Sequence, residues 1–219
     1  MPCVAASTSP GFNDSTMECK PTQIPEVLLL TPKVYGDSRG FFMETFSESR
    51  YSEVGVSGRF VQDNYSHSVG PVLRGLHYQL QRPQAKLVSV MWGEIFDVAV
   101  DIRVGSPTFG NWVGHTLSDK NRYQLFVPGG FAHGFCVLSD KADVMYKCTG
   151  YYEPNDDRGI LWSDPEIGID WPVEGPLISE KDCAHRPLSD VPHEELPVFA
   201  AAERAFPSAQ APRDDAPTA

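Results

Sequence analysis

The sequence predicts an antiparallel β-sandwich or β-barrel in which helix is confined to short segments. Short runs of β-branched and aromatic residues recur along the chain, and Gly, Pro, Asn and Asp separate them. In residues 96–101, apolar Phe, Val and Val alternate with Asp, Ala and Asp, which is the two-residue period of a strand. Many short strands at such spacing are typical of sandwiches and barrels.

The individual elements follow from these runs and from the turn residues between them. Strands are expected over residues 26–30, 41–46, 60–65, 72–78, 86–92, 95–102, 112–117, 124–128, 132–138 and 144–151. Helix is expected over residues 48–54 and again just after Ser179. There, Ser179 and the acidic residue three positions later resemble the N-cap and capping box of a helix start.

Length and composition predict one globular domain with unstructured ends. The chain has 219 residues, 41% of them hydrophobic and 21% charged, which is enough for one sizeable core and too little for two. Residues 1–23 are rich in Ser, Thr and Pro and are expected to form a disordered extension. Residues 197–219 form a tail with too little apolar surface to offset the entropy of ordering. The folded domain is therefore expected to span residues 24–196.

The acidic composition excludes several classes of partner. A net charge of -11 argues against nucleic acids and anionic membranes, because both attract basic surfaces. Any anionic ligand must therefore be held by a local group of arginines. The five cysteines are odd in number and irregularly spaced, which fits neither a disulfide framework nor a zinc module and indicates reduced thiols. No apolar run reaches the length of a membrane span and no signal peptide is recognisable, so we expect a soluble cytoplasmic protein.

The first candidate for chemistry is His77. Metal-binding small barrels usually present two histidines two positions apart and a nearby carboxylate, because the ion needs several converging ligands. Gln79 takes the second place here, so His77 has no metal-binding partner at that spacing and is free to transfer a proton. A lone strand histidine is more often a hydrogen-bonded structural residue. Polar neighbours such as Arg74 favour the functional interpretation.

Two other strand residues have a functional and an ordinary interpretation. Lys86 begins an otherwise apolar strand and shares a face with Val88 and Val90. That lysine either faces the interior or extends from the strand end to water. Tyr146 lies in a strand, where a tyrosine ordinarily packs in the core or against a neighbouring strand.

Three polar residues outside these strands are equally open. Asp182 fits the electrostatics of a helix start. Arg39 follows a Gly-Asp pair and is typical of a solvated turn. His133 lies among glycines, which indicates either a tight corner of the sheet or a close approach of the backbone to a ligand. Sequence spacing alone does not decide between these interpretations.

Several short motifs occur in a definite order along the chain. They are YGD at residues 35–37, RGFF at 39–42, QDN at 62–64, LRGLH at 73–77, FDVAVD at 96–101 and FAHGF at 131–135. The ordered set, within a stretch from about residue 24 to about residue 190, closely resembles the dTDP-4-dehydrorhamnose 3,5-epimerase family. The resemblance implies a cupin-type jelly roll or β-sandwich, a homodimer, and no metal or other cofactor. It also implies conversion of dTDP-4-dehydro-6-deoxy-D-glucose to dTDP-4-dehydro-L-rhamnose by proton transfer at two ring carbons, 3 and 5.

The same resemblance implies four catalytic roles. His77 is similar to the family's base, and Asp182 to the carboxylate that holds the tautomer of that base. Lys86 matches the lysine that offers positive charge to the developing enolate oxygen. Tyr146 matches a proton donor on the opposite face of the sugar, and a tyrosine pKa of about 10 keeps it protonated at neutral pH.

A further set of residues is implied in substrate binding. They are Arg39, Phe42, Glu44, Gln62, Asn64, Arg74, His133 and Tyr152. In the family an N-terminal strand crosses to the neighbouring subunit, so residues 39–44 are expected to reach the nucleotide of a partner, with Tyr35 near its thymine or the interface. Arg74 suits the forked geometry of phosphate, and Tyr152 is a candidate for stacking on the base.

Two alternatives to the double epimerase stay open. A relative that inverts only carbon 3 or only carbon 5 would use the same chemistry, and the loop at residues 80–85 is one place where relatives vary. The second alternative is a protein of another class, either a metal-dependent cupin oxygenase or a non-catalytic sugar-nucleotide binder. The presence of both His77 and Tyr146 argues for the double reaction. Gln79 in place of a second histidine argues against the oxygenase, and the complete acid/base set argues against the binder.

Overall fold

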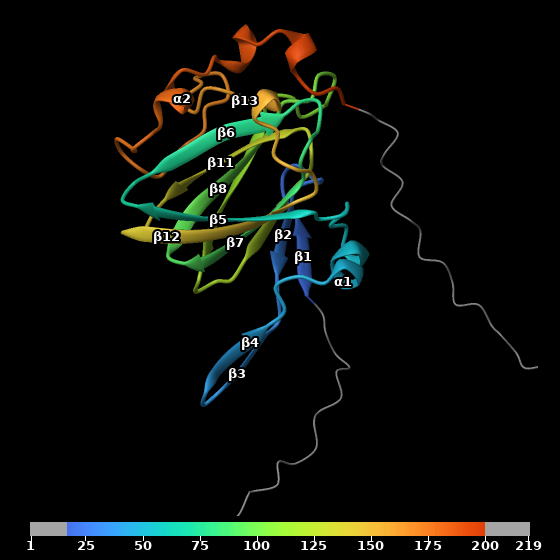
Figure 1. The fold of residues 1–219 in the computed structure, drawn as a ribbon, viewed down its shortest axis with the longest axis vertical. Coiled ribbons are helices and arrows are strands. Elements are labelled where there is room, and N and C mark those ends of the chain that lie inside the picture. Colours follow the sequence, from blue (N-terminus) through green and yellow to red (C-terminus); the bar gives the residue numbers. More distant parts are fainter. Residues whose placement is uncertain (1–16, 200–219) are drawn as a thin grey trace, which may run out of the picture.

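Residues 17–199 fold into two antiparallel β-sheets packed face to face, with a small hairpin extending away from them (Figure 1). The structure is a computed structural model, and it describes this range of the chain. In Figure 1, β5, β12 and β7 belong to one sheet, and β6, β11 and β8 to the other.

The first sheet has six strands in the order β1-β2-β10-β7-β12-β5, and the second has five in the order β13-β6-β11-β8-β9. The six strands are Glu18–Pro21 (β1), Leu28–Thr31 (β2), Gln124–Val127 (β10), Lys86–Trp92 (β7), Lys141–Cys148 (β12) and Gln62–Val69 (β5). The five strands are Asp157–Gly159 (β13), Leu73–Gln79 (β6), Phe131–Val137 (β11), Glu94–Asp101 (β8) and Trp112–Ser118 (β9). The hairpin pairs Val34–Asp37 (β3) with Gly40–Met43 (β4).

The helices are short, as the sequence predicted. They are the α-helices Glu48–Glu53 (α1) and Glu180–Cys183 (α2) and the 3-10 helices Pro154–Asp156 (η1), Leu188–Asp190 (η2) and His193–Glu195 (η3). Ser179 caps α2 as expected, because its side chain accepts a hydrogen bond from the backbone N–H of Asp182. Within residues 17–199, no helix is both long and apolar enough to cross a membrane.

The connectivity is that of a jelly roll. From β5 to β12 the chain passes from one sheet to the other at every step except that from β8 to β9. Each of the ten expected strands overlaps an observed one, and the bounds of β7 are those predicted. The predicted all-β sandwich is therefore confirmed.

Alternating side chains divide the apolar residues between two faces of each strand. On β8, Ile95 and Ala99 pack between the sheets, while Val98 and Val100 pack on the outer face of the five-stranded sheet. The segment after β13 covers this outer face with residues such as Leu188. Both faces of the five-stranded sheet are thus buried, so packing on each side holds the strands and their side chains in fixed positions.

Two facing glycines bring β6 and β11 unusually close together. A Cβ on Gly75, whose φ is +134°, would lie 2.6 Å from the Cα of Gly134, and one on Gly134 would lie 2.7 Å from the carbonyl oxygen of Arg74. Neither site accepts a larger residue without moving backbone. The register shifts at this point, and directly beside it His133 pairs with His77 across the two strands.

The ordered part of the chain extends further at both ends than the sequence predicted. Glu18–Pro21 lie within the expected disordered extension, 1–23, yet form β1 and pair with β2. At the other end, Val198 bridges to Val104, so the first residues of the expected tail, 197–199, are attached to the domain. Residues 1–16 and 200–219 of the two expected disordered ends lie outside the described residues.

Candidate active site

A cavity of about 310 Å³ lies between the two sheets and holds most of the predicted site residues. Its lining residues are Gln62, Asn64, His77, Tyr78, Gln79, Gln84, Lys86, Val127, Gly130, Phe131, His133, Tyr146, Tyr152 and Asp157. Strand alternation explains this collection of polar groups. Val88 and Val90 pack in the core between the sheets, so Lys86 at the start of the same strand points inward into the cavity, as one sequence interpretation predicted.

His77 faces the cavity and is paired with a buried carboxylate. Its strand neighbours Leu76 and Tyr78 pack into the outer cluster, which leaves the side chain of His77 on the opposite face. The Nε2 atom of His77 lies 2.7 Å from Oδ1 of Asp182. When Nε2–H donates this bond, the lone pair resides on Nδ1, which forms no hydrogen bond within residues 17–199. The His77 side chain is 32% exposed and that of Asp182 only 5%.

The carboxylate of Asp182 is fixed from several sides. The backbone N–H of Gly75 donates to Oδ2 at 3.3 Å, and the backbone of Asp182 is itself held by the helix cap at Ser179. Burial alone would raise the pKa of Asp182, but the hydrogen bonds from His77 and Gly75 outweigh it and lower that pKa below its usual value. Asp182 is therefore ionised at neutral pH and can stabilise a positive charge on His77.

A second histidine–aspartate pair lies deeper between the sheets. Nε2 of His133 is 2.8 Å from Oδ1 of Asp97, and the two side chains are 7% and 0% exposed. Burial lowers the pKa of His133 below its usual value, and it prevails over the opposing influence of Asp97. His133 is therefore a neutral imidazole at pH 7 that lines the cavity wall.

Lys86 and Tyr146 reach the cavity from the six-stranded sheet, and burial shifts their pKa values in opposite directions. Burial lowers the pKa of Lys86, although nearby Cys148, Asp97 and Asp157 favour its charged form. Burial raises the pKa of Tyr146 above its usual value, so its hydroxyl keeps its proton at pH 7. Lys86 thus brings an amine into the cavity whose charged form these neighbours favour against burial, and Tyr146 brings a proton.

The entrance of the cavity is lined by an acidic and aromatic group of side chains. The hydroxyl of Tyr152 donates to Oδ2 of Asp157 at 2.8 Å, and Lys181 forms an ion pair with the same carboxylate. Burial would raise the pKa of Asp157, but the bonds from Lys181 and Tyr152 lower it. The backbone N–H of Tyr152 donates to Gln62, whose side chain in turn donates to Asn64. Tyr152 is half exposed and its ring is available for stacking.

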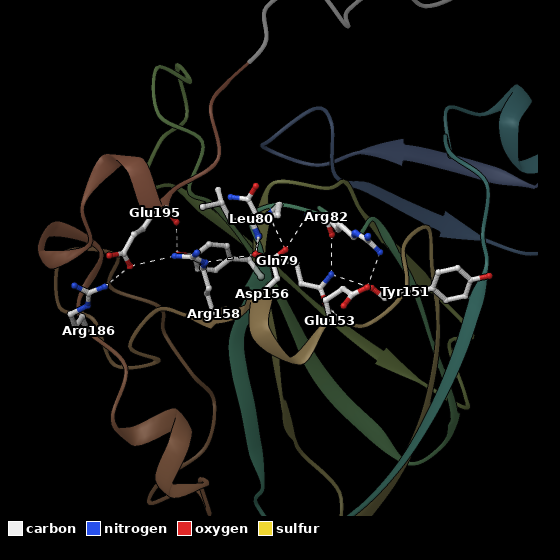
Figure 2. Close-up of polar contacts among 11 residues, drawn as sticks. Gln79, Leu80, Arg82, Tyr151, Glu153, Asp156, Arg158, Arg186 and Glu195 are labelled. Carbon is white, nitrogen blue, oxygen red and sulfur yellow. Dashed lines mark hydrogen bonds and ion pairs between the residues drawn. The ribbon is translucent and has the colours of Figure 1, made fainter.

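The loop at residues 80–85 is held in place by a buried carboxylate (Figure 2). The backbone N–H groups of residues 80, 81 and 82 all donate to Asp156, at 2.8 to 3.2 Å. Gln79 donates to the carbonyl oxygens of Arg82 and Tyr151 and accepts from the backbone N–H of Glu153. This network joins the loop to the segment that carries Tyr152, which lines the cavity together with Gln79.

The predicted catalytic and binding residues largely come together in this one cavity. Those lining it are Gln62, Asn64, His77, Lys86, His133, Tyr146 and Tyr152, with Asp182 behind His77. Arg74 does not line it, and its Nε donates to Ser68 at 3.2 Å. The charge of Arg74 nevertheless favours the ionised form of Tyr146 and so opposes the effect of burial on the pKa of that tyrosine.

The residues predicted to bind a partner's nucleotide lie away from the cavity of their own chain. Arg39 lies at the tip of the β3–β4 hairpin, with its side chain 88% exposed and bonded to Asp37. Phe42 is 64% exposed and Tyr35 42% exposed on the same hairpin. Glu44 forms an ion pair with Arg50 of α1.

Three residues of the site were not predicted from the sequence. Asp97 belongs to a motif whose alternation indicated a strand, but its pairing with His133 depends on the register between β8 and β11. Asp157 comes from the irregular segment after β12, where no pattern marks it. His185 lies beside Asp182 and His77, and these three offer ligand atoms within 4.8 Å of one another. Spacing along β6 did not predict a second histidine here, because it comes from a segment more than a hundred residues away.

Comparison with known proteins gives a consistent set of relatives. A family model described as dTDP-4-dehydrorhamnose 3,5-epimerase matches residues 21–190. The enzyme of that name from Shigella flexneri is 59% identical over 163 residues, covering 74% of this chain and 90% of that protein. The Neisseria gonorrhoeae one is 57% identical over 169 residues, which are 77% of this chain and 52% of that longer relative. The crystal structure of dTDP-6-deoxy-D-glucose-3,5-epimerase from Legionella pneumophila Philadelphia 1 in complex with dTDP-4-keto-L-rhamnose is 54% identical, with a TM-score of 0.83, covering 85% of this chain and 100% of that one.

Proposed function

The chain belongs to the dTDP-4-dehydrorhamnose 3,5-epimerase family, and we propose that it catalyses the family's reaction in the cavity between the two sheets. Its substrate is dTDP-4-dehydro-6-deoxy-D-glucose, and its product is dTDP-4-dehydro-L-rhamnose. One observation supports the assignment of this reaction to particular residues. His77 and Tyr146 face the same cavity from opposite sheets, so a sugar ring between them has a base on one face and a donor on the other. Epimerisation requires that arrangement, because the proton must leave one face and return to the other.

The first step is removal of the proton from a carbon next to the ketone. Asp182 accepts the Nε2–H of His77, so Nδ1 carries the lone pair that takes the proton. The electron pair of the broken C–H bond moves to the ketone oxygen and forms an enolate. The ammonium of Lys86 supplies the positive charge that stabilises this oxygen.

The second step returns a proton to the opposite face of the same carbon. The hydroxyl of Tyr146 donates it, the enolate returns to the ketone, and the configuration of the carbon is inverted. Exchange with water then restores the proton of Tyr146 and removes the one on His77. The same pair of groups acts at carbons 3 and 5 in turn, since both flank the ketone, and no net oxidation or reduction occurs.

Proton NMR of the substrate with enzyme in deuterium oxide tests this function. The expected result is deuterium at both carbons and a product inverted at both. Inversion at one carbon alone would indicate a single-centre epimerase, and the absence of any exchange would contradict epimerase activity altogether.

We further propose a homodimer in which the β3–β4 hairpin reaches the nucleotide of the partner subunit. The hairpin extends away from its own domain (Figure 1), and its exposed Tyr35, Phe41 and Phe42 offer apolar surface for a second copy. Arg39 at its tip is exposed to meet an anionic group. The free thiols of Cys19, Cys136, Cys148 and Cys183 fit a reducing compartment, and we place the enzyme in the cytoplasm.

Mixed dimers test the shared site. Chains carrying Arg39→Ala and chains carrying His77→Ala are mixed under conditions in which neither alone is active. The hybrid then collects both defects in one site and leaves the other site intact, so activity should return. If the hybrid stays inactive while forming normally, Arg39 acts within its own subunit.

A further inference from the structure

His185 lies beside the proposed base, and the mechanism above does not use it. It follows helix α2, and its ring meets that of His77 edge-on, with centroids 6.0 Å apart. Its Nε2 lies 3.8 Å from Oδ1 of Asp182. This nitrogen is shielded from solvent and has no hydrogen-bond partner among the residues that the structure describes. An unpaired buried nitrogen beside a buried carboxylate calls for a physical explanation.

A glycine provides the space that the ring of His185 occupies. Gly159 of β13 pairs with His77, and a Cβ at Gly159 would lie 2.2 Å from Nε2 of His185. Any larger residue at that position would displace the imidazole from its place near Asp182. The absence of a side chain at Gly159 therefore leaves the space beside β13 that the His185 ring fills.

We propose that His77, Asp182 and His185 form a binding site for a divalent transition-metal ion of the zinc class. Their ligand atoms all lie within 4.8 Å of one another. A tetrahedral zinc ion with bonds of about 2.0–2.2 Å keeps its ligands about 3.4 Å apart, so small side-chain movements suffice to bring these three around one ion. Two imidazoles and one carboxylate are a ligand set that zinc accepts in proteins, with a fourth position left for water.

The surroundings of the site favour a bound cation. Asp182 accepts the backbone N–H of Gly75 with Oδ2, which leaves Oδ1 turned toward both imidazoles. Such outer contacts fix the orientation of a ligand in metal sites. Lys181, the nearest lysine along the chain, is engaged with Asp157 rather than with this carboxylate. An ion reaches the site through the cavity, because His77 is partly exposed there.

A bound ion would switch off proton abstraction. Bonded to Nε2 of His77, it replaces the proton at that atom, and the neutral imidazole then carries its proton on Nδ1. The proposed reaction needs Nδ1 unprotonated, so metal binding and catalysis exclude one another. This consequence rests on the proposed function, whereas the binding of the ion does not.

Calorimetric titration of Zn²⁺ into nucleotide-free protein tests the site directly. Cys183→Ser is used as the background, because Cys183 is an exposed thiol next to Asp182. We expect one ion per chain and at least a 10-fold weaker affinity in His185→Gln, since loss of even an outer contact weakens metal sites by about 10–100-fold. His67→Gln is the matched control, because His67 is also paired with an aspartate, Asp143, but on an exposed strand. Equal affinity in His185→Gln and the background protein would overturn the proposal.

The nitrogen NMR of the Cys183→Ser protein provides a test that does not depend on how His185→Gln folds. Zn²⁺ must shift the imidazole resonances of His77 and His185 together, and a shift of only one of them, or of neither, would overturn the site. Zn²⁺ should also stop deuterium exchange into the substrate, and a chelator should restore it. Binding at both histidines without loss of exchange would contradict the role of His77 as base and leave the metal site standing.

Discussion

Two histidine–aspartate pairs lie close together on the five-stranded sheet, and they differ in exposure far more than in geometry. His77 lies 2.7 Å from Asp182, and His133 lies 2.8 Å from Asp97. The His77 side chain is 32% exposed, whereas that of His133 is 7% exposed and its aspartate is fully buried. The same pair of groups, an imidazole and a carboxylate, thus occurs once in a partly exposed and once in a buried environment.

Exposure assigns different tasks to these pairs. A base must gain a proton from the substrate and release it to water, which a side chain open to the cavity can do. Charging a fully buried imidazole is expensive, and burial already lowers the pKa of His133. We therefore assign proton transfer to His77, and to His133 the role of a neutral group that contacts the substrate and stabilises the sheet.

Replacing the exposed histidine should have the largest effect on activity. His77→Ala is expected to lower the rate of epimerisation by at least about 10²–10⁴-fold, the usual cost of losing a general base, because the same base serves both carbons. Binding of dTDP, measured by calorimetry, should change little, since His77 acts at the sugar. A mutant that loses nucleotide binding together with activity would contradict this division.

Removing the buried aspartate should instead act on stability. Asp97→Ala is expected to lower the free energy of unfolding by about 1–3 kcal/mol, because it leaves the neutral imidazole of His133 without its hydrogen-bond partner inside the protein. Asp182→Ala should cost less, because water can reach His77 and take the place of the carboxylate. Urea unfolding of both variants measures the difference, and equal losses would show that exposure does not separate the two pairs.

Tyr146 is the counterpart of His77 on the other sheet, and its removal sharpens the comparison. Tyr146→Phe deletes only the hydroxyl, so proton abstraction by His77 should continue. Delivery of a proton to the opposite face should fall by about 10²-fold, the lower end of the effect of a lost general acid, and carbon 5 should suffer most. In NMR the variant should exchange protons while accumulating partly epimerised sugar or returned substrate. Normal formation of the doubly inverted product would mean that Tyr146 serves only in packing.

The smallest expected effect is the response of stability to pH. Burial lowers the pKa of His133 in the folded protein, so the unfolded chain takes up this proton first as the pH falls below about 6.5. Stability is therefore lost on acidification, by at most about 1.4 kcal/mol per pH unit for this one group. His115 and His185, whose pKa values burial also lowers, act in the same direction. Between pH 7 and pH 5 the free energy of unfolding should fall less steeply in His133→Asn, and parallel curves would contradict the assignment.

Much of the fold follows from local patterns in the sequence. Apolar runs separated by turn residues locate all the long strands, and the alternation in residues 96–101 identifies the two faces of β8. The strands that were missed are β1, β3 and β13, each of three or four residues. They are too short to show a period, and β1 and β13 exist because a neighbouring strand offers them hydrogen bonds.

The site is less accessible to such reasoning, because it depends on contacts between distant segments. The position of Lys86 on an inward face follows from alternation, and His77 was a candidate on its own. The place of Asp182 behind His77 was implied only by the family resemblance, since the two are 105 residues apart. His185 lies close to His77 and Asp182 because Gly159 leaves room for its ring. No local sequence pattern predicts this contact.

Deuterium exchange into the substrate by His77→Asn and His133→Asn, measured side by side at saturating substrate, tests the central claim most directly. The two variants make the same chemical change in the two pairs, so they differ only in the environment of the lost imidazole. We predict no exchange at carbon 3 or carbon 5 with His77→Asn and continued exchange at both with His133→Asn. Exchange that persists in His77→Asn and stops in His133→Asn would contradict the account and make the buried pair the base.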